Sequence, residues 1–300
     1  MRRLMFVFII LALVLQAPKS YSATEPANYC YVPPFAGNMV KPNVLIVMDF
    51  SDSMQSRAYS STNYDPKTTY SGYFEPGKCY KYNSSGQYFE EANCDCPNGI
   101  GTSSCISGNL LNWVSATRID IARKILTGGR RESRDVLVNG RRESRDVLVS
   151  EGAEYTIEDK NLNCYFEIKA PQTHNRELTI ECPRGVSIIS SAKIAVRPSD
   201  PSSIKGIIHN FCNTSDPDLP IYKQCQIIME FMVFASDDRY GVIKVGKNGT
   251  IAQLIDAINY GTPTGEKTPT GKALREAYDY YRQIDFYDYA SNSNHISKGN

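Results

Sequence analysis

Residues 44–54 read VLIVMDFSDSM, an apolar run that ends at Asp49 and gives way to alternating polar side chains. The run at 44–48 has no polar alternation, which is typical of a strand covered on both faces of a parallel sheet. In an extended segment Asp49, Ser51 and Ser53 project to one side and offer a carboxylate and two hydroxyls together. These hard oxygen ligands suit Mg²⁺, Mn²⁺ or Ca²⁺. Because ligands of such sheets bind beyond the carboxyl ends of the strands, the pattern predicts a metal site, with an ordinary polar turn as the alternative.

Length and charge limit the class of protein. Three hundred residues suffice for one or two domains with a full core, and a formal net charge of +1 argues against a general binder of nucleic acid or of membrane surfaces. Residues 1–23 have a basic start, a short apolar core and a small-residue exit, which predicts a secretory signal peptide, or alternatively an uncleaved anchor. Residues 24–42 contain four prolines and are expected to be an irregular lead-in. No later segment has the pattern of a membrane span.

The nine cysteines are expected to form disulfides if the chain is exported. They form two groups of four and leave Cys30 alone: Cys79, Cys94, Cys96 and Cys105, then Cys164, Cys182, Cys212 and Cys225. The sequence does not decide the connectivity, and zinc binding by the first group is an alternative.

Two stretches between the core elements have the pattern of insertions. Residues 55–108 are rich in Ser, Asn, Gly and Tyr, which predicts a disulfide-pinned surface insertion that either contacts a partner or packs on itself. Within the second, at about 128–225, GRRESRDVLV occurs at 129–138 and again at 140–149. This duplication predicts a hairpin or a looped ladder, and its arginines are expected on a solvated face, neutralised by neighbouring acids, rather than in an anion site.

Regular elements flank and follow these insertions. Apolar side chains at helical spacing predict one amphipathic helix over 109–126 and a second over 250–260. Residues 226–234 and 240–245 have the pattern of two strands that return to the main sheet. A third helix is expected after Pro269, with an apolar stripe of Ala273, Leu274, Ala277, Tyr278 and Tyr281.

Three segments together resemble known families. The Asp-x-Ser-x-Ser pattern at 49–53 resembles the metal-ion-dependent adhesion site of von Willebrand factor A domains, and residues 267–274 resemble the Thr-x-Thr-Gly-x-Ala-Leu segment of the same domains. Residues 111–129 look like the first helix of PilY-type proteins, which are type IV pilus tip-associated adhesins and assembly factors. The resemblance implies an α/β von Willebrand A fold, doubly wound with a mostly parallel sheet, over residues 43–300. It also implies that Thr268 is a fourth metal ligand beside Asp49, Ser51 and Ser53.

The function implied by this resemblance is adhesion. A divalent cation would bind a carboxylate donated by a protein ligand or host surface or by a pilus subunit, on an exported protein at the cell surface, at the pilus tip or in the periplasm. The alternative is a structural pilus assembly factor whose domain needs no metal. No nucleophile with a matched base is recognisable, so an enzyme is not expected. The family's last metal-site Asp does not follow Thr268 before Asn300, so we expect the chain to be an amino-terminal piece of a longer protein.

Overall fold

The computed structural model describes residues 41–282, except for residues 139, 173, 184–186, 235–240 and 266–267. The predicted signal peptide, nearly all of the lead-in and Cys30 lie outside this part of the chain. No helix within the described residues is both long enough and apolar enough to cross a bilayer.

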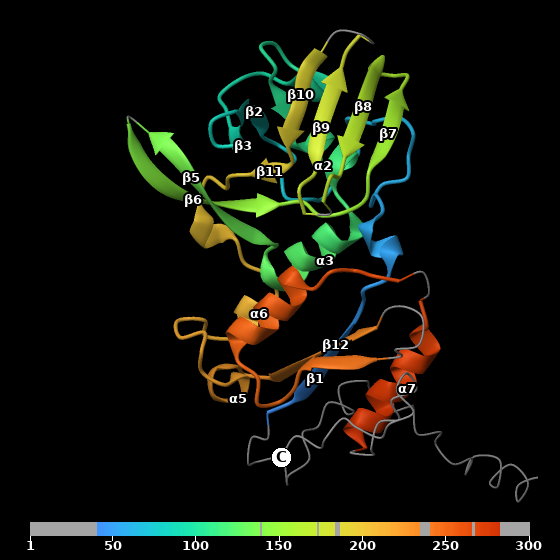
Figure 1. Ribbon diagram of the computed structural model, residues 1–300, viewed down its shortest axis with the longest axis vertical. Helices are drawn as coiled ribbons and strands as arrows, with labels where there is room; N and C mark the ends of the chain where they lie inside the picture. Colours follow the sequence, from blue (N-terminus) through green and yellow to red (C-terminus); the bar gives the residue numbers. More distant parts are fainter. Residues whose placement is uncertain are drawn as a thin grey trace, which may run out of the picture. The chain divides into compact units, whose positions relative to one another are not determined.

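The strand predicted at 44–48 is the first strand of a three-stranded sheet (Figure 1). β1 (Asn43–Asp49) pairs in parallel with β12 (Ile228–Phe234), in a register that places Asp49 opposite Phe234. The other edge of β12 pairs in antiparallel orientation with β13 (Val242–Val245). The two strands predicted to return the chain to the main sheet are therefore confirmed, although 178 residues separate β1 from β12.

Helices pack against both faces of this sheet. Met229, Phe231 and Val233 of β12 share a core with α3 (Arg118–Thr127) and α6 (Ile251–Tyr260). The same core includes the short helices α4 (Ile208–Phe211) and α5 (Ile221–Gln224). Glu230 of β12 alternates with these β12 residues and so points to the opposite face of the sheet. There its side chain is hydrogen-bonded to Tyr280 of α7 (Thr270–Tyr281). Helices therefore lie on both faces of the sheet, but β1 itself is less covered than its apolar sequence predicts: Met48 is its one buried residue, and Val44 is 40% exposed.

The chain between β1 and β12 forms two further sheets with a second core. The six-stranded sheet has the order β4-β2-β3-β11-β6-β5, and the four-stranded sheet has the order β10-β9-β8-β7. The strands of the first are β2 (Cys79–Asn83), β3 (Tyr88–Glu91), β4 (Ile106–Ser107), β5 (Arg131–Val138), β6 (Arg141–Val149) and β11 (Ala195–Val196). Those of the second are β7 (Tyr155–Asp159), β8 (Cys164–Lys169), β9 (Glu177–Glu181) and β10 (Ser187–Lys193). α2 (Gly108–Ser115) is buried along its whole length between them and brings Trp113 against Phe166.

The fold is therefore mixed α/β, as predicted, but the described residues do not form a doubly wound, mostly parallel sheet. Apart from β1 with β12 and a single pair between β11 and β3, every strand pairing is antiparallel. The reason is the connections: most neighbouring strands of the middle region are joined by short turns, and a short turn can only join antiparallel strands.

Of the two alternatives for the tyrosine-rich segment, the structure shows packing on itself: Tyr64, Tyr70, Tyr80 and Tyr88 are at most 5% exposed. One expectation for the helices of the middle region needs correction. The helix predicted over 109–126 is two helices, because Thr117 begins α3 with a capping box in which its hydroxyl accepts from the Asp120 N–H and the Asp120 carboxylate accepts from the Thr117 N–H. Ile125, one of the apolar side chains at helical spacing, is 58% exposed.

Eight cysteines form four disulfides within the two predicted groups. The pairs are Cys79–Cys96, Cys94–Cys105, Cys164–Cys182 and Cys212–Cys225. The zinc alternative for the first group is wrong, since all four of its sulfurs are in disulfides. Disulfides of this density are typical of proteins outside the reducing cytoplasm.

Candidate metal centre at the end of β1

The first three predicted ligands lie together where β1 ends. The Ser51 N–H donates to Asp49 Oδ1 at 2.7 Å, which turns the chain out of the sheet directly after the strand. A 3₁₀ turn over Asp52–Gln55 follows, and it brings the Ser53 hydroxyl to 2.9 Å from the Ser51 hydroxyl. Ser51 is only 1% exposed, so its hydroxyl is held in one place rather than free to rotate in water.

The fourth predicted ligand reaches the same place from the other end of the chain. Thr268 Oγ1 lies 3.4 Å from Ser51 Oγ, although the two residues are 217 positions apart. Both hydroxyls and the carboxylate therefore gather at the carboxyl end of β1, the edge at which the sequence predicts the site.

A set of hydrogen bonds that the sequence did not predict holds the two segments together. The Thr264 N–H donates to Phe50 O at 2.7 Å, and the Asp52 N–H donates to Gly265 O at 2.9 Å. In return, the Gly265 N–H donates to Asp52 Oδ1 at 3.1 Å, and Gln55 Nε2 donates to Pro263 O at 2.7 Å. Asp52 is thus a clamp for the second loop and not part of the predicted ligand set.

A signal for this clamp was present in the sequence. Thr-Pro-Thr-Gly occurs twice, at 262–265 and at 268–271. The first copy supplies the loop that bonds to residues 50–52, and its Gly265 has φ +107°, a conformation that glycine adopts without strain. The second copy supplies Thr268 and opens α7. The first copy therefore holds the loop against residues 50–52, and the second copy contributes Thr268 to the site.

Phe50, which lies between the predicted ligands Asp49 and Ser51, is closely packed beneath the site. Phe50 is 4% exposed and meets Phe231 of β12 edge to face, with ring centroids 6.1 Å apart. Gly261 follows α6 directly, and a Cβ on it would lie 2.3 Å from the Phe50 ring. The glycine thus allows the end of α6 to approach Phe50, while Gly261 O accepts a hydrogen bond from Arg123 of α3.

The donor set suits a hard cation. It consists of one carboxylate and three hydroxyls, which are oxygen ligands of the type that Mg²⁺, Mn²⁺ and Ca²⁺ prefer. Within the described residues no cluster of three or more His, Cys, Asp or Glu side chains could hold a metal ion. The predicted ligand set has one carboxylate, that of Asp49, beside three Ser and Thr hydroxyls.

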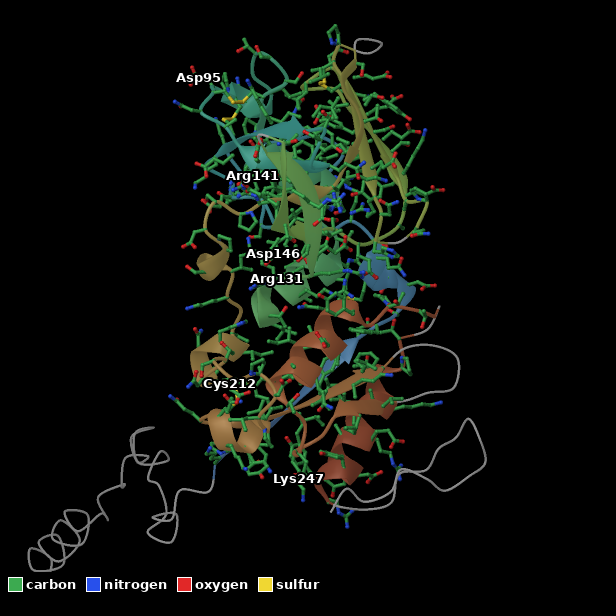
Figure 2. All side chains as sticks on the ribbon, turned by 60° about the vertical axis from the view of Figure 1, so that its left-hand side comes forward. Asp95, Arg131, Arg141, Asp146, Cys212 and Lys247 are labelled. Atoms are coloured by element: carbon green, nitrogen blue, oxygen red, sulfur yellow. A yellow bond between two sulfur atoms is a disulfide. The ribbon has the colours of Figure 1, made fainter. Side chains whose placement is uncertain are left out.

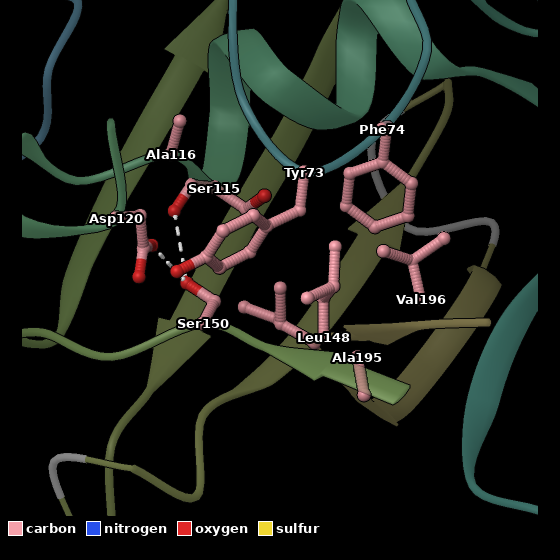
Figure 3. A pocket seen from close by; sticks show the side chains of 10 residues that line it. Tyr73, Phe74, Ser115, Ala116, Asp120, Leu148, Ser150, Ala195 and Val196 are labelled. Atoms are coloured by element: carbon pink, nitrogen blue, oxygen red, sulfur yellow. Dashed lines mark hydrogen bonds between the residues drawn. The ribbon is translucent and has the colours of Figure 1, made fainter. Parts of the chain in front are cut away.

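A second polar cluster lies in the protein interior beside α2 and α3 (Figure 3). Ser150 donates to Asp120 at 2.6 Å, and Arg176 donates to Ser150 and to Ser115 O, both at 2.7 Å. Burial raises the pKa of Asp120 above its usual range. The cavity there has a volume of about 10 Å³, roughly enough for one water molecule. We therefore interpret this cluster as a structural polar core.

The middle of the chain is similar in sequence to known proteins. Residues 61–183 match a family model described as PilY1 homolog, small alpha/beta domain. The chain is also 35% identical over 129 residues to a protein named Type IV pilus biogenesis factor PilY1 homolog, from Xylella fastidiosa. That similarity covers 39% of this chain and 9% of the relative, so the chain spans a small part of the protein it resembles. No solved structure matches the chain.

The matched region and the candidate metal centre are separate in sequence. The family model covers most of the tyrosine-rich segment, α2, α3, the duplicated hairpin and strands β7 to β9. It includes neither residues 49–53 nor Thr268. The PilY-type resemblance is therefore confirmed over residues 61–183, independently of the metal-site pattern.

Proposed function

We propose that this chain belongs to an exported factor for type IV pilus biogenesis and acts there as a structural module. The observation that carries the proposal is the match of residues 61–183 to the PilY1-homolog domain, supported by the identity to a named pilus biogenesis factor. Four disulfides support a location in the periplasm, at the cell surface or at the pilus tip. Pilus subunits are the expected partners.

The test is piliation of the bacterium that carries the gene. Removing residues 61–183 in frame from the full-length protein is expected to abolish surface pili, counted by electron microscopy, while the secreted protein remains detectable. Normal pilus number in that strain would contradict an assembly role. Secretion is the control, because loss of the protein itself would also remove pili.

A second function, metal-dependent binding of a carboxylate, is favoured by one specific observation. The Ser51 hydroxyl lies 2.9 Å from the Ser53 hydroxyl and 3.4 Å from the Thr268 hydroxyl. We interpret β1, β12 and β13 with α3, α6 and α7 as part of a von Willebrand A domain, with insertions at about 55–108 and 128–225. When bound, the cation would attract a partner's carboxylate, and few anionic ligands would leave it electron-poor.

Calorimetric titration with Mg²⁺, Mn²⁺ and Ca²⁺ tests this second function. Thr268→Ala is expected to remove the binding isotherm of the wild-type chain. Thr270→Ala is the matched control, since the Thr270 hydroxyl donates to the Thr268 carbonyl oxygen at 3.4 Å and is not one of the predicted ligands. In cells, Asp49→Ala with Ser51→Ala should lower adhesion while pili still assemble. Loss of pili with normal adhesion by the surviving pili would instead favour the structural role alone.

A further inference from the structure

The duplicated segment pairs with itself inside the chain. RESRDVLV occupies 131–138 on β5 and 142–149 on β6, and the two strands are antiparallel. Arg134 lies opposite Arg145, and these arginines occupy the same position in the two copies. The flanking pairs therefore recur on either side: Ser133 faces Asp146, and Asp135 faces Ser144. The hairpin has a local two-fold symmetry centred on the arginine pair.

This symmetry shows that one strand of this sequence accepts an identical strand as its antiparallel partner. Ser133 donates to Asp146 at 2.6 Å across the hairpin. Like charges meet at the centre, but Glu132 lies 3.8 Å from Arg134, and Glu143 contacts Arg145 in the same way. Each arginine thus has an acid two residues before it, which offsets the repulsion between the two.

β5 has a second edge that could accept such a partner. Within the part of the chain that the structure describes, β5 pairs with β6 alone and ends the six-stranded sheet. Figure 1 shows the hairpin extending beyond the other strands, and Figure 2 marks its second strand at Arg141 and Asp146 and its base at Arg131. Ser133 and Asp135 are exposed there.

The hydrogen-bond pattern shows which groups point outward. The Val149 N–H donates to Arg130 O at 3.0 Å, so every second residue from 130 onward faces β6. The N–H and C=O groups of Ser133 and Asp135 therefore point away from β6. At the base, Arg131 O accepts from the Tyr260 hydroxyl and the Arg131 side chain donates to Ile204 O. Pairing along the outer edge is thus restricted to residues beyond Arg131.

We propose that β5 pairs with β5 of a second copy of this chain, antiparallel and centred on Arg134. Ser133 of each copy would face Asp135 of the other, as Ser133 faces Asp146 within the hairpin. Strand addition at an exposed edge is a common mode of recognition, and its main-chain hydrogen bonds supply much of the affinity. Charged edge strands usually resist pairing, but here the side chains that face each other are the ones that already face each other in the hairpin. The hydrogen-bond phase differs: Arg134 and Arg145 are a hydrogen-bonded pair, whereas the two copies of Arg134 would form a pair without mutual hydrogen bonds. The proposal is independent of the pilus and metal functions.

Disulfide trapping tests the register directly. The experiment uses the full chain with Cys30→Ser, and Arg134→Cys then places one thiol on each side of the two-fold axis of the proposed dimer. Facing residues of a pair without mutual hydrogen bonds have Cα atoms about 4.5 Å apart. A disulfide spans that distance. Mild oxidation is expected to give a covalent dimer on non-reducing gels. Arg145→Cys is the matched control, because it occupies the same repeat position but lies opposite Arg134, inside the hairpin. Equal dimer yields from the two variants would overturn the proposal.

A proline variant separates edge pairing from chance collision. Asp135→Pro in the Arg134→Cys chain removes an outward N–H from each copy, and loss of two such bonds is expected to lower the dimer yield about ten-fold. Asp146→Pro, at the same repeat position on β6, should leave the yield unchanged. Equal effects of the two prolines would contradict the proposal.

The wild-type chain provides a readout that does not depend on a variant folding. Amide exchange at Ser133 and Asp135 should slow as protein concentration rises, since dimerisation would protect these outward N–H groups. Exchange rates at these two amides that do not change with concentration would overturn the proposal.

Discussion

At the residue scale, the buried carboxylate of Glu151 joins two arginines and should matter strongly to stability. Its Oε2 lies 2.7 Å from Arg123 and 2.7 Å from Arg130, and the side chains of Glu151 and Arg123 are at most 1% exposed. The sequence predicted a solvated face for the duplicated arginines, and for Arg130 that prediction is wrong. The local alternation of charges could not show that Glu151, 21 residues away, turns back to meet it.

We expect Glu151→Gln to lower the free energy of unfolding by about 3–5 kcal/mol, because it leaves two arginines without their buried counter-charge. Urea unfolding at neutral pH measures this loss. Glu167→Gln is the control, since Glu167 pairs with an exposed Lys169 at 3.4 Å and such pairs contribute about 0–1 kcal/mol. Similar losses of unfolding free energy in both variants would show that the buried ion pairs of Glu151 contribute no more than an exposed pair.

His209 predicts a pH dependence at the same scale. Burial lowers the pKa of His209, and its Nδ1 accepts from the Gly206 N–H at 3.2 Å, which an imidazolium could not do. Below about pH 6.5 the unfolded chain therefore takes up a proton before the folded chain, so folding stability should fall as pH falls through this range. Unfolding midpoints at pH 7.5 and 5.5 should differ less in His209→Gln than in wild type. An identical pH response in the two chains would contradict this assignment.

At the scale of elements, the start of α3 shows how a cap divides what periodicity predicts as one helix. Thr117 is fully buried, and besides capping α3 its hydroxyl donates to Glu151 O at 2.7 Å. Thr250 caps α6 with a capping box of the same type but is partly exposed. We expect Thr117→Ala to cost about 2 kcal/mol and Thr250→Ala about 1 kcal/mol, both measured by urea unfolding. A larger loss from Thr250→Ala would contradict the added role of the Thr117 hydroxyl.

Periodicity predicted where elements occur better than which faces they bury. α6 lies where the sequence predicts it, and Ile251, Leu254 and Ile258 are buried. In α7, by contrast, Ala273 and Glu276 are buried, whereas Leu274 and Tyr278 of the predicted apolar stripe are about 60% exposed. The spacing gave a stripe, but the rotation of the helix depends on the strand it meets, and that strand is distant in sequence. The burial of Tyr80 on β2 and Tyr88 on β3 likewise depends on packing partners that local spacing does not reveal.

At the scale of the whole molecule, the order of motifs along the chain predicted which residues meet at the end of β1 better than it predicted the sheets. The strand before Asp49 and the Thr-bearing loop were enough to bring four predicted residues to one edge. The sheets of the middle region depend on partners such as β11 with β3 and β6, whose pairings join segments more than 40 positions apart. Short runs of two residues carry no pattern from which such partners can be predicted.

The last prediction concerns coupling across the molecule by the candidate metal. A ligand that binds only the folded chain raises its stability by about 2.7 kcal/mol at a hundred times its dissociation constant. Because Ser51 and Thr268 belong to segments 217 positions apart, a cation held by both would stabilise the contact of the α7 loop with β1. We expect saturating Mg²⁺ or Mn²⁺ to raise the unfolding midpoint of the wild-type chain, and a chelator to reverse the shift. Thr268→Ala should abolish the shift and Thr270→Ala should keep it. If both variants kept it, the cation would be binding elsewhere, and the convergence of hydroxyls at the end of β1 would serve packing alone.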